Sequence, residues 1–252
     1  TGQYMENLME NHGMSDIRTN YGNGGYNNWV DGQFDDGILY YSYRGYYGSS
    51  SINPSSGWDS YSETPFALTV TCGTGDFNGT SDSENFIRVG SVSNPSGAVA
   101  CVGVATTSTH TAYNNIVSMG TMAGAFSFGM YHAGAATAFG KISLLMTYPT
   151  NPYSCVTKFS QWTNLMGDPA LHLWTDKPKD FAPEYNSDVP DGINYLDVLV
   201  KDLDGNIVSD AKVTVRRPGN VFETAYSNGS GEVTLVWQNA NGPLNLSVHK
   251  NN

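Results

Sequence analysis

Basic residues are scarce in this chain of 252 residues, and so are long apolar runs. Lysine and arginine number 12 against 23 aspartates and glutamates, a formal net charge of −11. This balance argues against binding to nucleic acid or to an anionic membrane surface. No apolar run reaches the about 18 residues that a membrane-spanning helix needs, so we expect no membrane span.

The first residues also lack the basic and apolar regions of a signal peptide. They resemble the middle of a helix instead. We therefore expect the chain to be a processed product or one part of a longer precursor.

Cysteine is scarce as well. The three cysteines, Cys72, Cys101 and Cys155, cannot all pair, so at least one is free unless it bonds another chain. No CxxC pair and no His/Cys cluster at zinc spacing occurs. The glycine-rich turn at 73–75 lacks the lysine and the spacing of a phosphate-binding loop. We expect neither a metal ion nor another cofactor.

The residues that are present can form a core. Hydrophobic residues make up 39% of the chain and aromatic residues 12%, which argues against a disordered chain. Charged residues are only 14%, and Gly, Ser, Thr, Asn and Tyr supply most of the polar surface. Such a composition is typical of secreted bacterial proteins, so we expect a secreted or cell-surface location.

Three apolar, turn-bounded segments at 38–43, 65–71 and 97–105 alternate with helical patterns. This alternation predicts an α/β fold in which the three strands are parallel and joined by right-handed crossovers. The carboxyl ends of parallel strands meet at one edge, where open α/β sheets place their active-site groups. Cys72 follows the second strand and His110 the third, so both are predicted to lie on that rim.

Composition changes at 176–183, a charged stretch with two prolines, and we place a domain boundary there. Beyond it, short alternating segments are separated by Asp-Gly and Asn-Gly turns, which predicts a small antiparallel β-sandwich. The predicted domains are 1–178 and 179–252.

Several segments, taken in order, resemble one family. Pro65-Phe66 and then Cys72, followed by Gly75-Asp76-Phe77, resemble the nucleophile segment of the gingipain-type cysteine peptidases, relatives of caspases and legumain. Tyr43-Arg44-Gly45 is similar to the start of the family's Tyr-Xaa-Gly-His-Gly segment. Gly167-Asp168-Pro169 is similar to the family's exit from the catalytic domain.

This resemblance implies a caspase-like parallel-sheet sandwich, incomplete at its N-terminal side, followed by an immunoglobulin-like β-sandwich. It also implies a cysteine endopeptidase with Cys72 as the nucleophile. One position departs from the family: Tyr46 stands where the general-base histidine is placed, and Tyr47 is inserted before Gly48. The phenol of tyrosine ordinarily titrates near pH 10, so it cannot replace an imidazole near neutral pH.

The remaining candidate for the base is His110, with Asn114 or Asn115 to orient it. The alternative is that His110 caps a loop or lines a pocket. The backbone N–H groups of Gly45 and Cys72 are the candidate oxyanion hole, the first by resemblance.

Three aromatic residues, Tyr46, Tyr47 and Trp58, together with Asn114, are candidates for lining a peptide site, although the aromatic side chains are equally consistent with surface packing. The expected partners are a peptide or protein substrate or ligand, other copies of the chain, or the N-terminal part of the same precursor.

Two functions follow. The first is a secreted cysteine peptidase, active or degenerate. The second is a catalytically inactive extracellular binding or structural subunit built on the peptidase fold.

Overall fold

The computed structural model describes residues 1–22, 24–49, 52–54, 57–58, 63–176, 179–190, 192–238 and 242–250. The chain forms two compact units, Thr1–Asp176 and Lys177–Asn252. The boundary predicted between 178 and 179 adjoins residues 177–178, which lie outside the described residues.

The first unit is built on a four-stranded sheet of order β1-β2-β3-β4. Its strands are β1 (Tyr40–Ser42), β2 (Phe66–Leu68), β3 (Ala100–Val104) and β4 (Thr163–Met166). β1, β2 and β3 are parallel, whereas β4 pairs antiparallel with β3. The predicted α/β fold with a parallel-containing sheet is confirmed.

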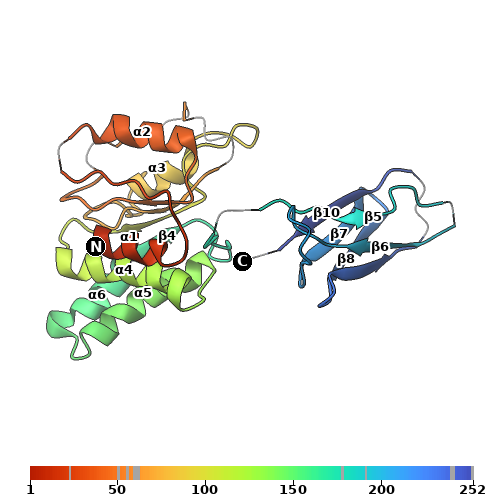
Figure 1. The fold of residues 1–252 in the computed structure, drawn as a ribbon. Helices are drawn as coiled ribbons and strands as arrows, with labels where there is room; N and C mark the ends of the chain where they lie inside the picture. Colours follow the sequence, from red (N-terminus) through yellow and green to blue (C-terminus); the bar gives the residue numbers. More distant parts are fainter. Residues whose placement is uncertain are drawn as a thin grey trace. The chain divides into compact units, whose positions relative to one another are not determined.

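Helices cover both faces of this sheet (Figure 1). One layer holds α2 (Tyr26–Asp36) and α3 (Asp82–Arg88). The other layer holds α1 (Gly2–Glu10), α4 (Thr111–Ser127), α5 (Ala133–Thr147) and α6 (Cys155–Trp162). The short 3-10 helix Pro152–Ser154 directly precedes α6.

This double cover explains the unbroken apolar runs of the strands, since a strand buried on both faces has no polar side. Phe66 and Leu68 belong to the core on the α4 side. Ala67 belongs to the core on the α3 side, together with Phe34 and Phe86.

α4 and α5 pack closely because small residues line their contact. A Cβ added at Gly120 would clash with Ser143 Oγ, and one added at Gly140 would clash with Thr121 Oγ1. Glycine at these two positions therefore lets the two helix backbones approach each other.

The second unit contains two three-stranded antiparallel sheets around one core. One sheet is β5 (Glu184–Tyr185), β6 (Tyr195–Leu199) and β9 (Glu232–Val236), and the other is β10 (Asn245–His249), β7 (Lys212–Arg217) and β8 (Val221–Tyr226). Its assignment as an immunoglobulin-like module stays a prediction.

Among the described residues, no helix combines the length and the apolar character that a membrane crossing requires.

The turn after Cys72 depends on a contact between two glycines. A Cβ added at Gly75 would lie 2.6 Å from the carbonyl carbon of Gly103 in β3 and 2.8 Å from Val104 N. Backbone atoms cannot give way as a flexible side chain does. The turn therefore lies directly on β3 only because residue 75 has no side chain.

We expect Gly75→Ala to lower the free energy of unfolding of the first unit by about 1–3 kcal/mol, the usual cost of overpacking a core. Gly32→Ala is the matched control, because Gly32 lies inside α2 and an added Cβ meets nothing within 4 Å. It should raise stability by about 0.5–1 kcal/mol. Urea unfolding followed by tryptophan fluorescence measures both, and equal effects of the two changes would contradict the contact.

Candidate functional site

The loops that follow β1, β2 and β3 meet at one edge, as predicted. Tyr47 and Cys72 form a parallel bridge, and Gly48 N–H donates to the Cys72 carbonyl at 3.0 Å. On the other side, Gly73 N–H donates to the Thr106 carbonyl at 2.8 Å. Cys72 therefore sits between the loop after β1 and the loop after β3, which carries His110.

The Cys72 thiol is half-buried and hydrogen bonds to a neighbouring hydroxyl. Its Sγ lies 2.8 Å from Thr109 Oγ1, which also accepts from Asn114 Nδ2 at 2.9 Å. A threonine hydroxyl has two lone pairs and one proton, so it can accept from the amide and still bond to sulfur. Asn114 or Asn115 was predicted to orient His110, and Asn114 was also a candidate for lining a peptide site. Asn114 is instead buried and donates to Thr109, while Asn115 accepts from Arg44 Nε.

His110 is exposed and caps α4. Its Nδ1 accepts the N–H of Ala112 at 3.2 Å, and its ring meets Tyr113 edge-on at a centroid distance of 5.6 Å. In the neutral ring the proton then sits on Nε2, which is a donor and not a base. In the described part of the chain, no hydrogen bond joins His110 to Cys72. The ring of His110 thus caps the helix α4, and the role of His110 as a base for Cys72 stays a prediction.

The other predicted rim residues are exposed. Gly45 follows β1, and its carbonyl accepts from Thr71 Oγ1 at 3.2 Å. Tyr46, predicted to stand at the position of the family's histidine, is 95% exposed. Tyr47 is 57% exposed and its hydroxyl lies beside Gly73. Gly45 and Cys72 lie on neighbouring loops, and their role as an oxyanion hole stays a prediction.

Trp58 lies elsewhere. It is only 2% exposed and packs on Phe34 at a centroid distance of 4.1 Å, in the core between the sheet and the layer of α2 and α3. Its indole N–H donates to Asp31 Oδ1 at 2.7 Å. Trp58 is a core residue, because that buried indole both fills space and finds a carboxylate partner.

Sequence reasoning missed Arg44, which occupies the variable position of the Tyr-Xaa-Gly segment. Its Nε donates to Asn115 Oδ1 at 3.0 Å, while Nη1 is buried and has no partner among the described residues. Burial lowers the pKa of Arg44 to about 10, and the negative charge of a nearby Cys72 thiolate opposes this shift. Arg44 thus remains a cation near neutral pH and lies close enough to interact with the thiol.

A groove of about 650 Å³ runs along the edge strand β1 and reaches the rim at Arg44, Gly45 and Tyr46. α1 and α2 flank it, and its apolar lining includes Met5, Met9, Val30 and Tyr40. A groove of this size next to the rim can take part of a peptide chain.

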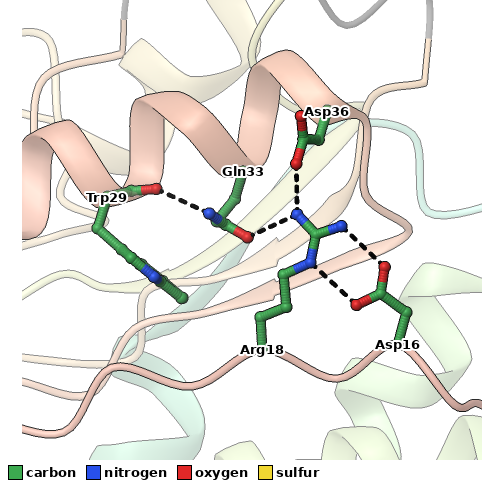
Figure 2. A network of polar contacts seen from close by, with 5 residues as sticks. All are labelled: Asp16, Arg18, Trp29, Gln33 and Asp36. Atoms are coloured by element: carbon green, nitrogen blue, oxygen red, sulfur yellow. Dashed lines mark hydrogen bonds and ion pairs between the residues drawn. The ribbon is translucent and has the colours of Figure 1, made fainter.

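The segment 17–22 also lines this groove, and Arg18 ties it to α2 (Figure 2). The Arg18 guanidinium pairs with Asp16 at 2.8 Å and with Asp36, and donates to Gln33 Oε1 at 2.9 Å. Gln33 in turn donates to the Trp29 carbonyl at 3.2 Å. The hydrogen bond from Arg18 holds the pKa of Asp16 below its usual range, and the two carboxylates raise the pKa of Arg18.

The other two cysteines differ from Cys72. Cys101 is fully buried in β3, where burial raises its pKa to about 11, so it is an inert core thiol. Cys155 is half-buried and hydrogen bonds to Tyr113. Among the described residues, no group of three or more His, Cys, Asp or Glu side chains is placed to hold a metal ion.

These features agree with the comparisons with known proteins. The model of peptidase family C25 matches residues 4–174, more than half of the chain. The chain therefore belongs to peptidase family C25, and the predicted gingipain resemblance is confirmed. No curated protein matches the sequence.

Solved structures share the fold. The crystal structure of the Arg-specific cysteine proteinase gingipain R (RgpB) aligns with a TM-score of 0.70 and 17% identity over 99% of this chain and 59% of that chain. A complex of Porphyromonas gingivalis RgpB pro- and mature domains aligns with a TM-score of 0.69 and 17% identity, over 99% of this chain and 60% of that chain. A third structure, of a protease, aligns with a TM-score of 0.71 and 14% identity, over 99% of this chain and 61% of that chain. The chain thus spans about three fifths of these structures.

The bond between Thr109 and Asn114 predicts a matched pair of variants. Thr109→Val should lower the free energy of unfolding by about 1–3 kcal/mol, because it leaves the buried Asn114 amide without its acceptor. Thr109→Ser keeps the hydroxyl and should cost clearly less. Urea unfolding of both variants tests this, and a loss no greater for valine than for serine would contradict the network.

The ion pair between Arg18 and Asp16 predicts a titration. Arg18→Gln should raise the Asp16 pKa toward its ordinary value, because the hydrogen bond from the Arg18 guanidinium is what lowers it. The stabilisation from this pair is present above about pH 4 and is lost as the pH falls through the depressed pKa. NMR titration measures the shift. Asp202, whose pKa is lowered by Asn206, is the internal control and should not change.

Proposed function

We propose that this chain is a non-hydrolytic binding or structural subunit that acts outside the cell and is built on the C25 peptidase fold. The observation that carries the proposal is the hydrogen bonding at the rim. The Cys72 thiol bonds to Thr109, the ring of His110 caps α4, and Tyr46, which the resemblance predicts at the position of the family's histidine, is exposed.

Peptide hydrolysis by a cysteine needs two proton transfers. A base must form or stabilise the thiolate, and an acid must then protonate the leaving amine. Arg44 can offset negative charge on the sulfur, but a guanidinium does not release a proton near neutral pH. Thr109 and Asn114 are not proton-transfer groups at this pH. Among the described residues, the rim therefore presents exposed aromatic side chains and a groove but no acid–base group hydrogen bonded to Cys72.

The ligand we propose for the rim is a peptide or protein segment. Tyr46 and Tyr47 present exposed aromatic surface, and the groove along β1 opens beside them. Exposed aromatic side chains next to a groove are typical of protein-binding sites. The composition, poor in lysine and rich in Tyr, Asn and Ser, supports a location outside the cell.

The second candidate is a cysteine peptidase with Cys72 as nucleophile and His110 as base. One observation favours it: His110 directly follows Thr109, whose hydroxyl contacts the thiol. Release of the helix cap on substrate binding would free Nδ1 to accept a proton within the same loop. The two candidates differ in the reactivity of one sulfur atom.

The test compares the alkylation rates of Cys72 and Cys155 by iodoacetamide, read by mass spectrometry. Both thiols are half-buried, so Cys155 is a matched control within the chain. A non-hydrolytic rim predicts rates within about tenfold of each other, because neither thiol is activated. Cys101 should react only after unfolding.

A Cys72 rate at least a hundred times that of Cys155, lowered by His110→Ala, would contradict the proposal and establish the peptidase. Incubation with a mixed peptide library provides the second readout. We expect no cleavage that distinguishes the wild-type chain from Cys72→Ser.

A further inference from the structure

The outer face of the sheet β10-β7-β8 in the second unit carries an unusual set of side chains. We call it the basic aromatic face. On β7 its residues alternate with the buried core positions Val213 and Val215, and on β10 with the partly buried Leu246 and Val248, whereas on β8 the intervening Glu223 is exposed. The face consists of nine residues: Lys212, Thr214, Arg216, Phe222, Thr224, Tyr226, Asn245, Ser247 and His249.

The strand register arranges this face in three rows. Lys212 lies opposite Tyr226, and Arg216 lies opposite Phe222. The row between them is hydroxylic, with Thr214 Oγ1 and Thr224 Oγ1 3.0 Å apart. The outer rows thus repeat one pairing, a cation beside an aromatic ring, and four residues along a strand separate them by about 13 Å.

The two aromatic residues of this face do not contribute to the core. Phe222 is 69% exposed and Tyr226 is 64% exposed. Burying an aromatic side chain stabilises a protein, so two large rings left in water on one flat face mark a binding surface.

The charge of the face is opposite to that of the chain. None of its nine residues is Asp or Glu, although the whole chain carries 23 of them and a net charge of −11. On the outer face of the other sheet, Glu184, Asp197 and Glu232 instead line a hollow. The basic aromatic face is therefore complementary to an anionic partner.

We propose that the basic aromatic face binds an acidic polysaccharide. Sugar rings have apolar faces of C–H groups that stack on aromatic rings such as Phe222 and Tyr226. Arg216 and Lys212 match the carboxylates of uronate residues, which arginine binds through two parallel hydrogen bonds. The hydroxyl row and the side chains of β10 suit sugar hydroxyls. The repeated rows suit a polymer whose charge recurs along its length, and not a single small anion.

This inference does not depend on the rim in the first unit, and its test leaves the rim intact. Binding of the full chain to polygalacturonate, alginate and heparin is measured by affinity electrophoresis and calorimetry. The fully methyl-esterified polygalacturonate is the matched neutral polymer. We expect binding to at least one acidic polymer, weakened with rising salt and at least tenfold weaker for the esterified one.

Phe222→Ala and Tyr226→Ala should each weaken binding at least fivefold, and Lys212→Gln with Arg216→Gln at least tenfold. Tyr195→Ala is the aromatic control, since Tyr195 is 51% exposed on the outer face of the other sheet. Lys158→Gln in the first unit is the cation control. Neither control should change affinity, and thermal unfolding verifies that every variant folds.

Four results would overturn the proposal. They are no binding to any of the three acidic polymers, equal binding to the esterified polymer, equal binding to single-stranded DNA, and losses in the controls as large as in the variants of the face. If Lys212→Gln instead abolished a concentration-dependent self-association, the face would be an interface between copies of this chain.

Discussion

The parallel alignment of β1, β2 and β3 is the constraint on which the first unit depends. Because helices cover both faces of the sheet, no ligand can reach its faces, and polar groups gather at the edge where the strands end. The contact of Gly75 with the backbone of Gly103 presses the turn after Cys72 onto β3. The position of this turn determines the distance between the Cys72 thiol and the loop that precedes α4.

At the rim, one structural demand competes with catalysis. The first turn of α4 has N–H groups without partners inside the helix, and His110 satisfies one of them with Nδ1. An imidazole that accepts this bond is not available as a base through the same nitrogen. The thiol in turn finds a hydroxyl, Thr109, which Asn114 holds in place. The hydrogen bonds at this helix terminus thus occupy Nδ1 of His110 and the hydroxyl beside the thiol.

The two units divide the chemistry of the chain. In the first, binding features lie at a sheet edge, with the groove along β1 and the buried guanidinium of Arg44. In the second, the two outer faces of the β-sandwich differ in charge, with Lys212 and Arg216 on β7 and with Asp197 and Glu232 on β6 and β9. Alternation along a strand allows the two outer faces to differ in charge, because every second residue faces outward while the others point toward the core.

By itself the sequence determined the α/β class, the parallel strands, the shared rim of Cys72 and His110, and the family, because apolar runs, turn residues and motif spacing are local signals. The resemblance to the family also predicts that Tyr46 stands at the position of the general-base histidine. The tertiary structure decided the rest. Trp58 lies in the core, Arg44 lies near the thiol, and His110 caps a helix, since these depend on contacts between distant segments and on side-chain direction, which no local pattern encodes.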